Sequence, residues 1–164
     1  MYKSQHLTCV SSTKDTVRSR IENIKRAGIQ NVMALRGDLT PELASADRSN
    51  WPYRYAVDLV RELKASGADF CIGGACYPEI HLESRNQEED IRHLKEKVDA
   101  GCDFLVTQMF FDNNLLYNFL YKIREAGITV PVIPGPSLYL FSRTWQSFLF
   151  FFLVHVKTCG TKTT

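Results

Sequence analysis

The chain has 164 residues and a formal net charge of +2, with 23% charged and 45% hydrophobic residues. This length suits one domain with a sizeable core, and the near-neutral balance argues against a nucleic-acid or membrane-surface partner, for which we expect a clustered basic face. The first residues, Met1 to His6, lack the apolar stretch of a secretory signal, so the expected compartment is the cytoplasm. Cys9, Cys71 and Cys102 lie in or beside predicted strands, where reduced thiols behave as small apolar residues.

One unit recurs along the chain: a charged helical segment, then Ala-Gly or Ser-Gly, then an apolar run. Its glycines are Gly28, Gly67, Gly101 and Gly127. A glycine just past a helix takes the left-handed conformation that closes the last turn, so each marks a helix end before a buried strand. The apolar runs are continuous instead of alternating, which is typical of a parallel sheet covered on both faces.

In chain order, this pattern predicts strands joined by helices. The expected strands cover 6–10, 31–35, 70–74, 104–108 and 130–133, and the expected helices cover 13–27, 53–65, 87–100 and 115–126, with a polar loop through residue 50. Ser12 is the expected cap of the first helix, with Asp15 three residues on. Such an α/β chain fits a complete doubly wound sheet or part of a TIM barrel, which needs eight units and about 250 residues. The pattern leaves that choice open.

From Ser137 onward the repeating unit is absent. Residues 148–154 are rich in aromatic side chains, and residues 157–164 are polar and of low complexity. The apolar run is too short to span a membrane, and its uncharged, β-prone character makes it an aggregation risk. We therefore expect one domain over residues 1–136, followed by an unrelated tail over residues 137–164.

Polar residues appear where the predicted strands end. Arg36-Gly37-Asp38 follows the second strand, the segment Tyr77 to His81 follows the third, and Gln108 ends the fourth. In parallel α/β folds, ligands bind at this edge of the sheet. An alternative for the same edge is a metal-dependent enzyme that uses Cys76, Glu79, His81 and His6, because mixed ligands of this kind can hold zinc. Three ligands so close at one strand end would be crowded, however.

Several segments together resemble the methylenetetrahydrofolate reductase family, in its order and at its approximate spacing. They are residues 6–9 (HLTC), 34–38 (ALRGD), 55–59 (YAVDL), 77–81 (YPEIH), 94–101 (LKEKVDAG) and 107–112 (TQMFFD). The resemblance runs from about His6 to Gly135 and implies a flavin-bearing (β/α)8 TIM barrel, incomplete here at about five βα units. It also implies that NADH or NADPH reduces bound FAD. The reduced flavin would then deliver a hydride to 5,10-methylenetetrahydrofolate and give 5-methyltetrahydrofolate.

The resemblance carries site residues onto this chain. The positions that match flavin-binding residues are His6, Arg36, Gly37, Asp38, Tyr55, Ala56, Tyr77, His81, Asp90 and Lys97, with His93 at a position of variable residue type. Among them, Arg36 and Lys97 are the expected partners of the pyrophosphate, and Asp90 of sugar hydroxyls. Asp38 and Gln108 match substrate-binding positions beside the pterin ring. A carboxylate at Asp38 would disfavour an anionic reduced flavin and favour a cationic folate intermediate.

The match fails at both ends. The family's general-acid glutamate lies upstream of His6, so we assign no catalytic residue, and we expect poor folate reduction because a positioned acid contributes roughly 10²- to 10⁴-fold. After Gly135 the match stops, for which a frameshift or read-through is our hypothesis. An incomplete barrel has open edges, so we expect marginal stability or a need for a partner fragment. An inactive truncated product is the alternative function. The choice between NADH and NADPH and the formation of a homo-oligomer stay open.

Overall fold

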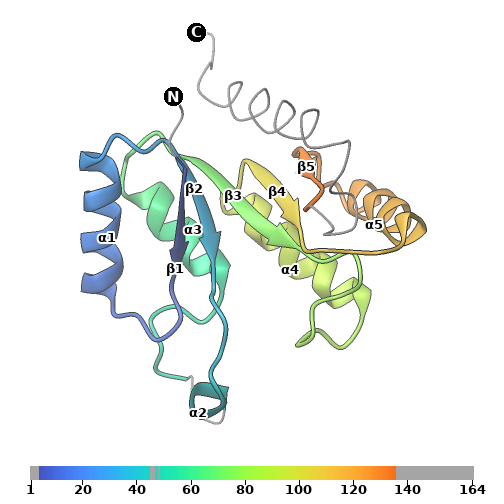
Figure 1. The fold of residues 1–164 in the computed structure, drawn as a ribbon, viewed down its shortest axis with the longest axis horizontal. Helices are drawn as coiled ribbons and strands as arrows, with labels where there is room; N and C mark the ends of the chain where they lie inside the picture. Colours follow the sequence, from blue (N-terminus) through green and yellow to red (C-terminus); the bar gives the residue numbers. More distant parts are fainter. Residues whose placement is uncertain (1–3, 45–46, 48, 136–164) are drawn as a thin grey trace, which may run out of the picture.

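The computed structural model describes residues 4–44, 47 and 49–135 (Figure 1). Strands and helices alternate along this part of the chain, with one short extra helix. The elements are β1 (Ser4–Thr8), α1 (Lys14–Arg26), β2 (Asn31–Leu35), α2 (Pro41–Ala44), α3 (Ala56–Ala65), β3 (Cys71–Cys76), α4 (Gln87–Asp99), β4 (Phe104–Thr107), α5 (Asn113–Glu125) and β5 (Val132–Ile133). The predicted alternation of strand and helix is confirmed.

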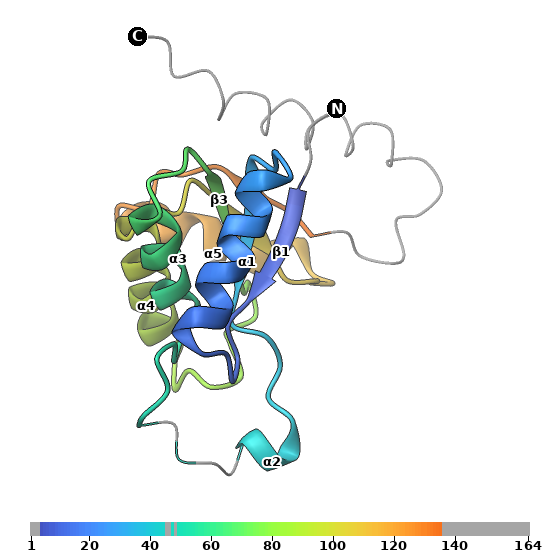
Figure 2. The ribbon, with the colours of Figure 1, turned by 90° about the vertical axis from the view of Figure 1, so that its left-hand side faces the viewer.

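The strands form one sheet in the order β1-β2-β3-β4-β5, and every neighbouring pair is parallel. Each connection therefore advances to the next neighbour, and because such crossovers are right-handed, the helices collect on one face of the sheet. Figure 2 shows α1, α3 and α4 on the same side of β1. A doubly wound sheet reverses its strand order at a switch point, and this sheet has no reversal. The fold is an arc of a TIM barrel, as the resemblance implied.

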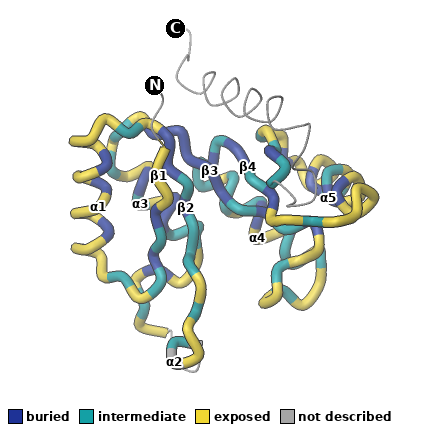
Figure 3. The backbone as a smooth tube through the Cα atoms, viewed as in Figure 1, coloured by how far each residue is buried: buried dark blue, intermediate teal, exposed yellow. Residues whose placement is uncertain are grey.

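Two clusters of buried side chains fill the space between helices and sheet. One joins α1 and α3 to β1, β2 and the start of β3, and the other joins α4 and α5 to the end of β3 and to β4. Fully buried members include Val17, Ile21, Leu59, Leu63, Leu105, Phe119 and Ile123. Figure 3 shows the buried chain along β2, β3 and β4 and the exposed outer surface of α1. Burial of these apolar faces is what holds the helices against the sheet.

The opposite face of the sheet carries a smaller cluster that depends on a glycine. Met33, Gly73 and Phe104 lie in register on neighbouring strands. A Cβ atom at Gly73 would lie 2.5 Å from the Phe104 ring and 2.8 Å from the Met33 sulfur. The missing side chain in β3 therefore makes room for the large side chains of β2 and β4, and the Gly73-Gly74 pair serves internal packing.

Several predicted boundaries are wrong by a few residues. The first helix is capped by Thr13, whose hydroxyl accepts the Thr16 N–H at 3.2 Å, and not by Ser12, which bonds back to Val10. The third helix begins at Ala56 instead of residue 53, because Asp58 captures two backbone N–H groups ahead of it. The polar loop after β2 contains the short helix α2.

The described cysteines lie in the interior. Cys9, Cys76 and Cys102 are buried free thiols, as expected for Cys9 and Cys102, and Cys71 is buried at the start of β3. Among the helices of the described residues, none has the length and apolar character needed to cross a membrane. The predicted boundary after residue 136 and the tail lie outside the described residues.

Candidate functional site

Backbone hydrogen bonds align the carboxyl ends of the strands. Past the end of β1, the N–H groups of Cys9 and Val10 donate to the Arg36 carbonyl at 3.2 and 2.8 Å. Across the next pairs, the Gln108 N–H donates to the Cys76 carbonyl at 2.7 Å, and the Gly135 N–H donates to the Thr107 hydroxyl at 2.7 Å. These bonds hold the loops at one edge of the sheet, where barrel enzymes carry their sites. We call this the carboxyl edge.

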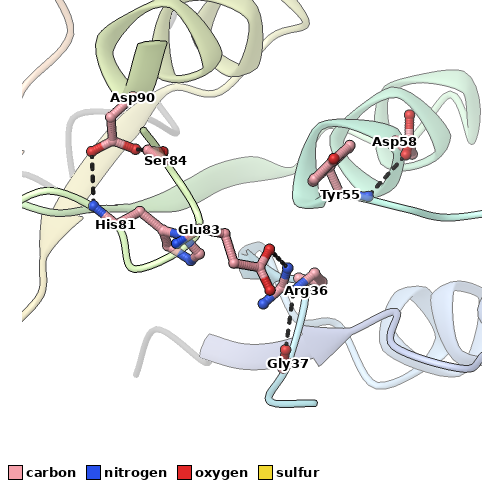
Figure 4. A network of polar contacts seen from close by, with 8 residues as sticks. All are labelled: Arg36, Gly37, Tyr55, Asp58, His81, Glu83, Ser84 and Asp90. Atoms are coloured by element: carbon pink, nitrogen blue, oxygen red, sulfur yellow. Dashed lines mark hydrogen bonds and ion pairs between the residues drawn. The ribbon is translucent and has the colours of Figure 1, made fainter. Parts of the chain in front are cut away.

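The turn after β2 needs its glycine. Gly37 has φ +93°, and a Cβ atom there would lie 2.9 Å from a Val10 methyl group. This turn directs the Arg36 side chain over the edge, where its Nε donates to the Gly37 carbonyl at 3.4 Å and its Nη1 pairs with the Glu83 carboxylate (Figure 4). Asp38 follows and is exposed. The Arg36 side chain is only 18% exposed, so its position is defined by these partners.

The loop between β3 and α4 is organised by one carboxylate. Asp90, in the first turn of α4, accepts the His81 N–H at 3.3 Å and the Ser84 hydroxyl at 3.2 Å (Figure 4). The Tyr77 ring meets the His81 ring edge-on, with centroids 4.6 Å apart and planes at 87°. Burial raises the pKa of the Tyr77 hydroxyl, the Arg36 charge opposes that shift, and the Asp90 charge adds to it. Tyr77 therefore lies among the charged groups of the edge.

This loop also stores backbone strain. Ile80 has φ +75°, in the left-handed region that β-branched residues rarely adopt. Its N–H donates to the Tyr77 carbonyl at 3.3 Å, which closes a tight turn just before His81. Strain of this kind costs on the order of 1–3 kcal/mol and clusters at functional sites. The turn therefore favours the carboxyl edge as the candidate site.

The start of α3 brings two more candidates to the same edge. Asp58 accepts the N–H groups of Arg54 and Tyr55 at 3.0 and 3.1 Å, which fixes the helix start at Ala56. The Tyr55 side chain is 49% exposed, and its ring runs nearly parallel to that of His93, with centroids 6.2 Å apart and planes at 18°. Tyr55 and Ala56 thus lie beside the β1 and β2 loops, to which the Cys9 thiol connects them through the Tyr55 carbonyl.

Two candidates lie apart from this group. Lys97, near the end of α4, extends under the sheet, and its Nζ donates to the Ala75 carbonyl at 2.7 Å. Burial lowers the pKa of this ammonium group, and its stem packs beside Gly74 and Cys102. His6 lies in the middle of β1, opposite Met33, and is exposed. The Lys97 charge interacts with that of Asp90, but the hydrogen bond of Lys97 goes to the sheet. The flavin-binding roles of Lys97 and His6 stay predictions.

The structure therefore gathers part of the predicted set. Arg36, Gly37, Tyr77, His81 and Asp90 form one connected group, with Asp38 next to Gly37 in sequence. Gln108 directly follows β4 at the same edge, and its side chain is exposed. The sequence reasoning missed Glu83 and Ser84, which complete the network (Figure 4). Their position in the sequence could have identified them, since polar residues in the loop after a buried strand are candidates for function.

The metal-centre alternative finds no support in the described part of the chain. There, no cluster of three or more His, Cys, Asp or Glu side chains is arranged to hold a metal ion. Burial raises the pKa of Cys76 to about 12, which opposes the thiolate that zinc requires. His81 Nδ1 already accepts the Glu83 N–H at 3.1 Å. The edge instead offers a guanidinium, an imidazole, a phenol and carboxylates, which suit a polar ligand with anionic groups.

Comparisons with known proteins give two kinds of similarity. The family model described as methylenetetrahydrofolate reductase matches residues 2–151, a range that passes the predicted boundary at 136. The chain is 41% identical over 138 residues to methylenetetrahydrofolate reductase 2 of Saccharomyces cerevisiae, covering 79% of this chain and 22% of that protein. It is 43% identical over 130 residues to 5,10-methylenetetrahydrofolate reductase of Salmonella typhimurium, covering 79% of this chain and 42% of that protein. It thus spans less than half the length of these relatives.

Solved structures share the fold. Phosphonopyruvate hydrolase superposes with a TM-score of 0.61 at 14% identity, covering 91% of this chain and 50% of that one. Dihydrodipicolinate synthase superposes with a TM-score of 0.52 at 13% identity, covering 82% and 45%. At such low identity the likeness supports the barrel arc and carries no inference about chemistry.

Proposed function

Because this chain belongs to the methylenetetrahydrofolate reductase family, we propose that it supplies the FAD- and folate-binding edge of a barrel that reduces 5,10-methylenetetrahydrofolate to 5-methyltetrahydrofolate. NADH or NADPH would be the reductant. The observation that carries the proposal is the connected group at the carboxyl edge, in which Arg36, His81 and Asp90 from three segments share one network (Figure 4). We further propose a cytoplasmic location.

The residues present fit FAD in their chemistry. Arg36 brings a guanidinium to the edge, and a guanidinium binds phosphate oxygens with several N–H groups at once. Gly37 permits the left-handed turn after β2 against Val10, which places Arg36 and Asp38 at the edge. Asp90 can bind sugar hydroxyls as a hydrogen-bond acceptor, and Tyr77 and Tyr55 offer aromatic surface. His6, Ala56 and Lys97 complete the proposed flavin-binding set.

When bound, FAD supplies the chemistry of accepting a hydride from the nicotinamide and passing it to the folate. The chain's part is to bind and orient. We propose that Asp38 places its negative charge beside the flavin and the pterin, and that Gln108 hydrogen-bonds the substrate ring. Both are exposed at the ends of β2 and β4, so they are accessible to a ligand that enters from solvent. We assign no catalytic acid within this chain.

An absorption spectrum of the purified chain tests the proposal. Stoichiometric flavin absorbance, with FAD identified after release by denaturation, is the expected result. Steady oxidation of NADH or NADPH by that preparation would then test the first half reaction, and added methylenetetrahydrofolate the second. A folded chain that binds no FAD at micromolar concentrations contradicts the proposed site, and a chain that binds FAD without turnover supports the inactive alternative. Arg36→Ala should lose FAD affinity in the same assay.

A further inference from the structure

Glu83 contacts two residues of the candidate site at once. Its carboxylate pairs with Arg36 Nη1, and its backbone N–H donates to His81 Nδ1 at 3.1 Å (Figure 4). Arg36 comes from the end of β2, whereas His81 and Glu83 belong to the loop before α4. One residue therefore ties the two loops together and touches a cationic and an aromatic candidate ligand group.

The contact with His81 sets where the imidazole proton lies. A nitrogen that accepts an N–H must offer its lone pair, so Nδ1 is unprotonated while this bond exists. In the neutral ring the proton is then on Nε2, which makes Nε2 a hydrogen-bond donor. The edge-on contact with Tyr77 at 4.6 Å fixes the plane of the same ring. His81 is thus held in one tautomer and one orientation.

The contact with Arg36 sets the direction of the guanidinium. The Arg36 side chain is 18% exposed and that of Glu83 is 39% exposed, so the pair lies at the surface of the edge. Nε and Nη1 of Arg36 have protein acceptors, and a guanidinium carries five N–H donors in a fixed plane. Anchoring two of its nitrogens orients the remaining donors without consuming them.

We propose that Glu83 is a positioning residue of the flavin site. It acts through Arg36, which its carboxylate orients, and through His81, whose donor tautomer its backbone N–H selects. This inference rests on the proposed function, because the ligand that Arg36 and His81 bind is FAD. Glu83 lies outside the segments that resemble the family. The Glu83 carboxylate bears a charge that repels phosphate, so its benefit must come from geometry.

A double-mutant cycle on FAD binding tests the action through Arg36. Glu83→Ala should weaken FAD binding about tenfold, and Glu83→Gln, which keeps an acceptor oxygen for Arg36, should stay within about twofold of the parent. In an Arg36→Ala background, Glu83→Ala should cause no further loss. Glu22→Ala, which removes the exposed pair with Lys25 on α1, is the matched control and should bind normally. An equal loss in both backgrounds, or none in the parent, overturns the inference.

Nitrogen NMR of the ligand-free chain gives a second readout that needs no flavin. The His81 ring should show a protonated Nε2 and an unprotonated Nδ1 at pH 8. The Arg36 Nε–H signal should be sharper in the parent chain than in Glu83→Ala. A Nδ1–H tautomer, or an Arg36 signal indifferent to Glu83, contradicts the positioning role. Loss of FAD binding in the parent with both NMR results as expected contradicts the proposed function alone.

Discussion

The two edges of the sheet differ in which residues take left-handed backbone conformations. At the amino edge, where helices turn into strands, the left-handed positions are glycines: Gly28, Gly67, Gly101 and Gly127. At the carboxyl edge, left-handed positions include Ser11 and Ile80, and among the described residues these are the non-glycine cases. A glycine takes such a conformation without strain, whereas a β-branched residue does not.

The polar side chains of the two edges also differ in their hydrogen-bond partners. At the amino edge, Asp103 accepts the Ile72 N–H at 2.8 Å and the Lys64 ammonium at 3.2 Å, so a side chain completes the sheet's own backbone bonding. At the carboxyl edge, Arg36, Glu83 and Asp90 bond mainly to one another and to loop groups (Figure 4). The comparison teaches that the amino-edge groups complete the bonding of the sheet, whereas the carboxyl-edge groups bond within their loops, which supports the proposed ligand site at that edge.

The largest expected effect separates two glycines. Gly37→Ala forces a side chain into a left-handed turn and against Val10, 2.9 Å away, so we expect a loss of about 3 kcal/mol in the free energy of unfolding. Gly28→Ala meets no atom within 4 Å and should lose about 1 kcal/mol, from the backbone alone. Urea unfolding of both variants measures the difference. Equal losses would show that space at the carboxyl edge is not limiting.

The next effect concerns the amino edge. Asp103→Ala leaves the Ile72 N–H without its acceptor, and we expect a loss of about 2 kcal/mol. Asp103→Asn keeps an acceptor oxygen and gives up mainly the partly exposed pair with Lys64, so about 0.5 kcal/mol should suffice. Neither variant should change the dissociation constant for FAD once folded. A weakened FAD affinity in folded Asp103→Asn would break the division between the edges.

A smaller effect concerns the strained turn. Ile80→Gly and Ile80→Ala both remove the contacts of a side chain that is 38% exposed, but only glycine takes φ +75° without strain. We therefore expect Ile80→Gly to be about 1 kcal/mol more stable than Ile80→Ala. If thermal unfolding shows Ile80→Gly to be the less stable of the two, the carboxyl edge does not store the strain we infer.

The smallest expected effect is a pH dependence of stability that comes from two buried thiols, one near each edge of the sheet. Burial raises the pKa of Cys76, at the end of β3, to about 12 and that of Cys102, before β4, to about 11, from 9.0. The unfolded chain therefore loses these protons first, so this stabilisation is full below pH 9 and declines as the pH rises, up to about 11 for Cys102 and about 12 for Cys76. Unfolding midpoints measured from pH 7 to 11 should fall accordingly.

Matched variants isolate each thiol in that titration. Lys97 packs beside both cysteines, and its pKa is lowered by burial, so its alkaline contribution has the opposite slope. Comparing Cys76→Ala and Cys102→Ala with the parent removes one thiol at a time and leaves Lys97 in place. Each variant should show a shallower decline above pH 9. If only one does, the two edges also differ in how well they exclude water beneath the surface.

Particular residues show which features of the fold could be predicted from the sequence. The glycines after each helix predicted the order of helices and strands because that signal is local, and the structure confirms it. Ser12 failed as a cap because Thr13, one residue on, has an equally suitable hydroxyl. The helix that starts at Ala56 was placed early because Asp58 bonds backward to Tyr55 and Arg54, which residue spacing does not display.

The candidate site was also predicted only in part from the sequence. Motifs identified Arg36, His81 and Asp90, since residue type and order are visible in a sequence. They did not show that Lys97 reaches the Ala75 carbonyl under the sheet, or that Glu83 connects Arg36 to His81. Such contacts join residues far apart in the chain, and only the packing of α4 and its loop against the sheet brings them together.

The sequence by itself determined the alternation of helices and strands, the family, and the residue types at the strand ends, because each is written in local pattern or in matched motifs. The repeating pattern left an open sheet and a barrel arc both possible, and the family resemblance predicted the barrel, but only the tertiary structure shows the pairing that confirms it. That choice lies in the strand order β1 to β5, which pairs segments through backbone bonds that any parallel strand could form. The physical reason is that strand pairing is set by how the helices pack on one face, and that information belongs to no single segment.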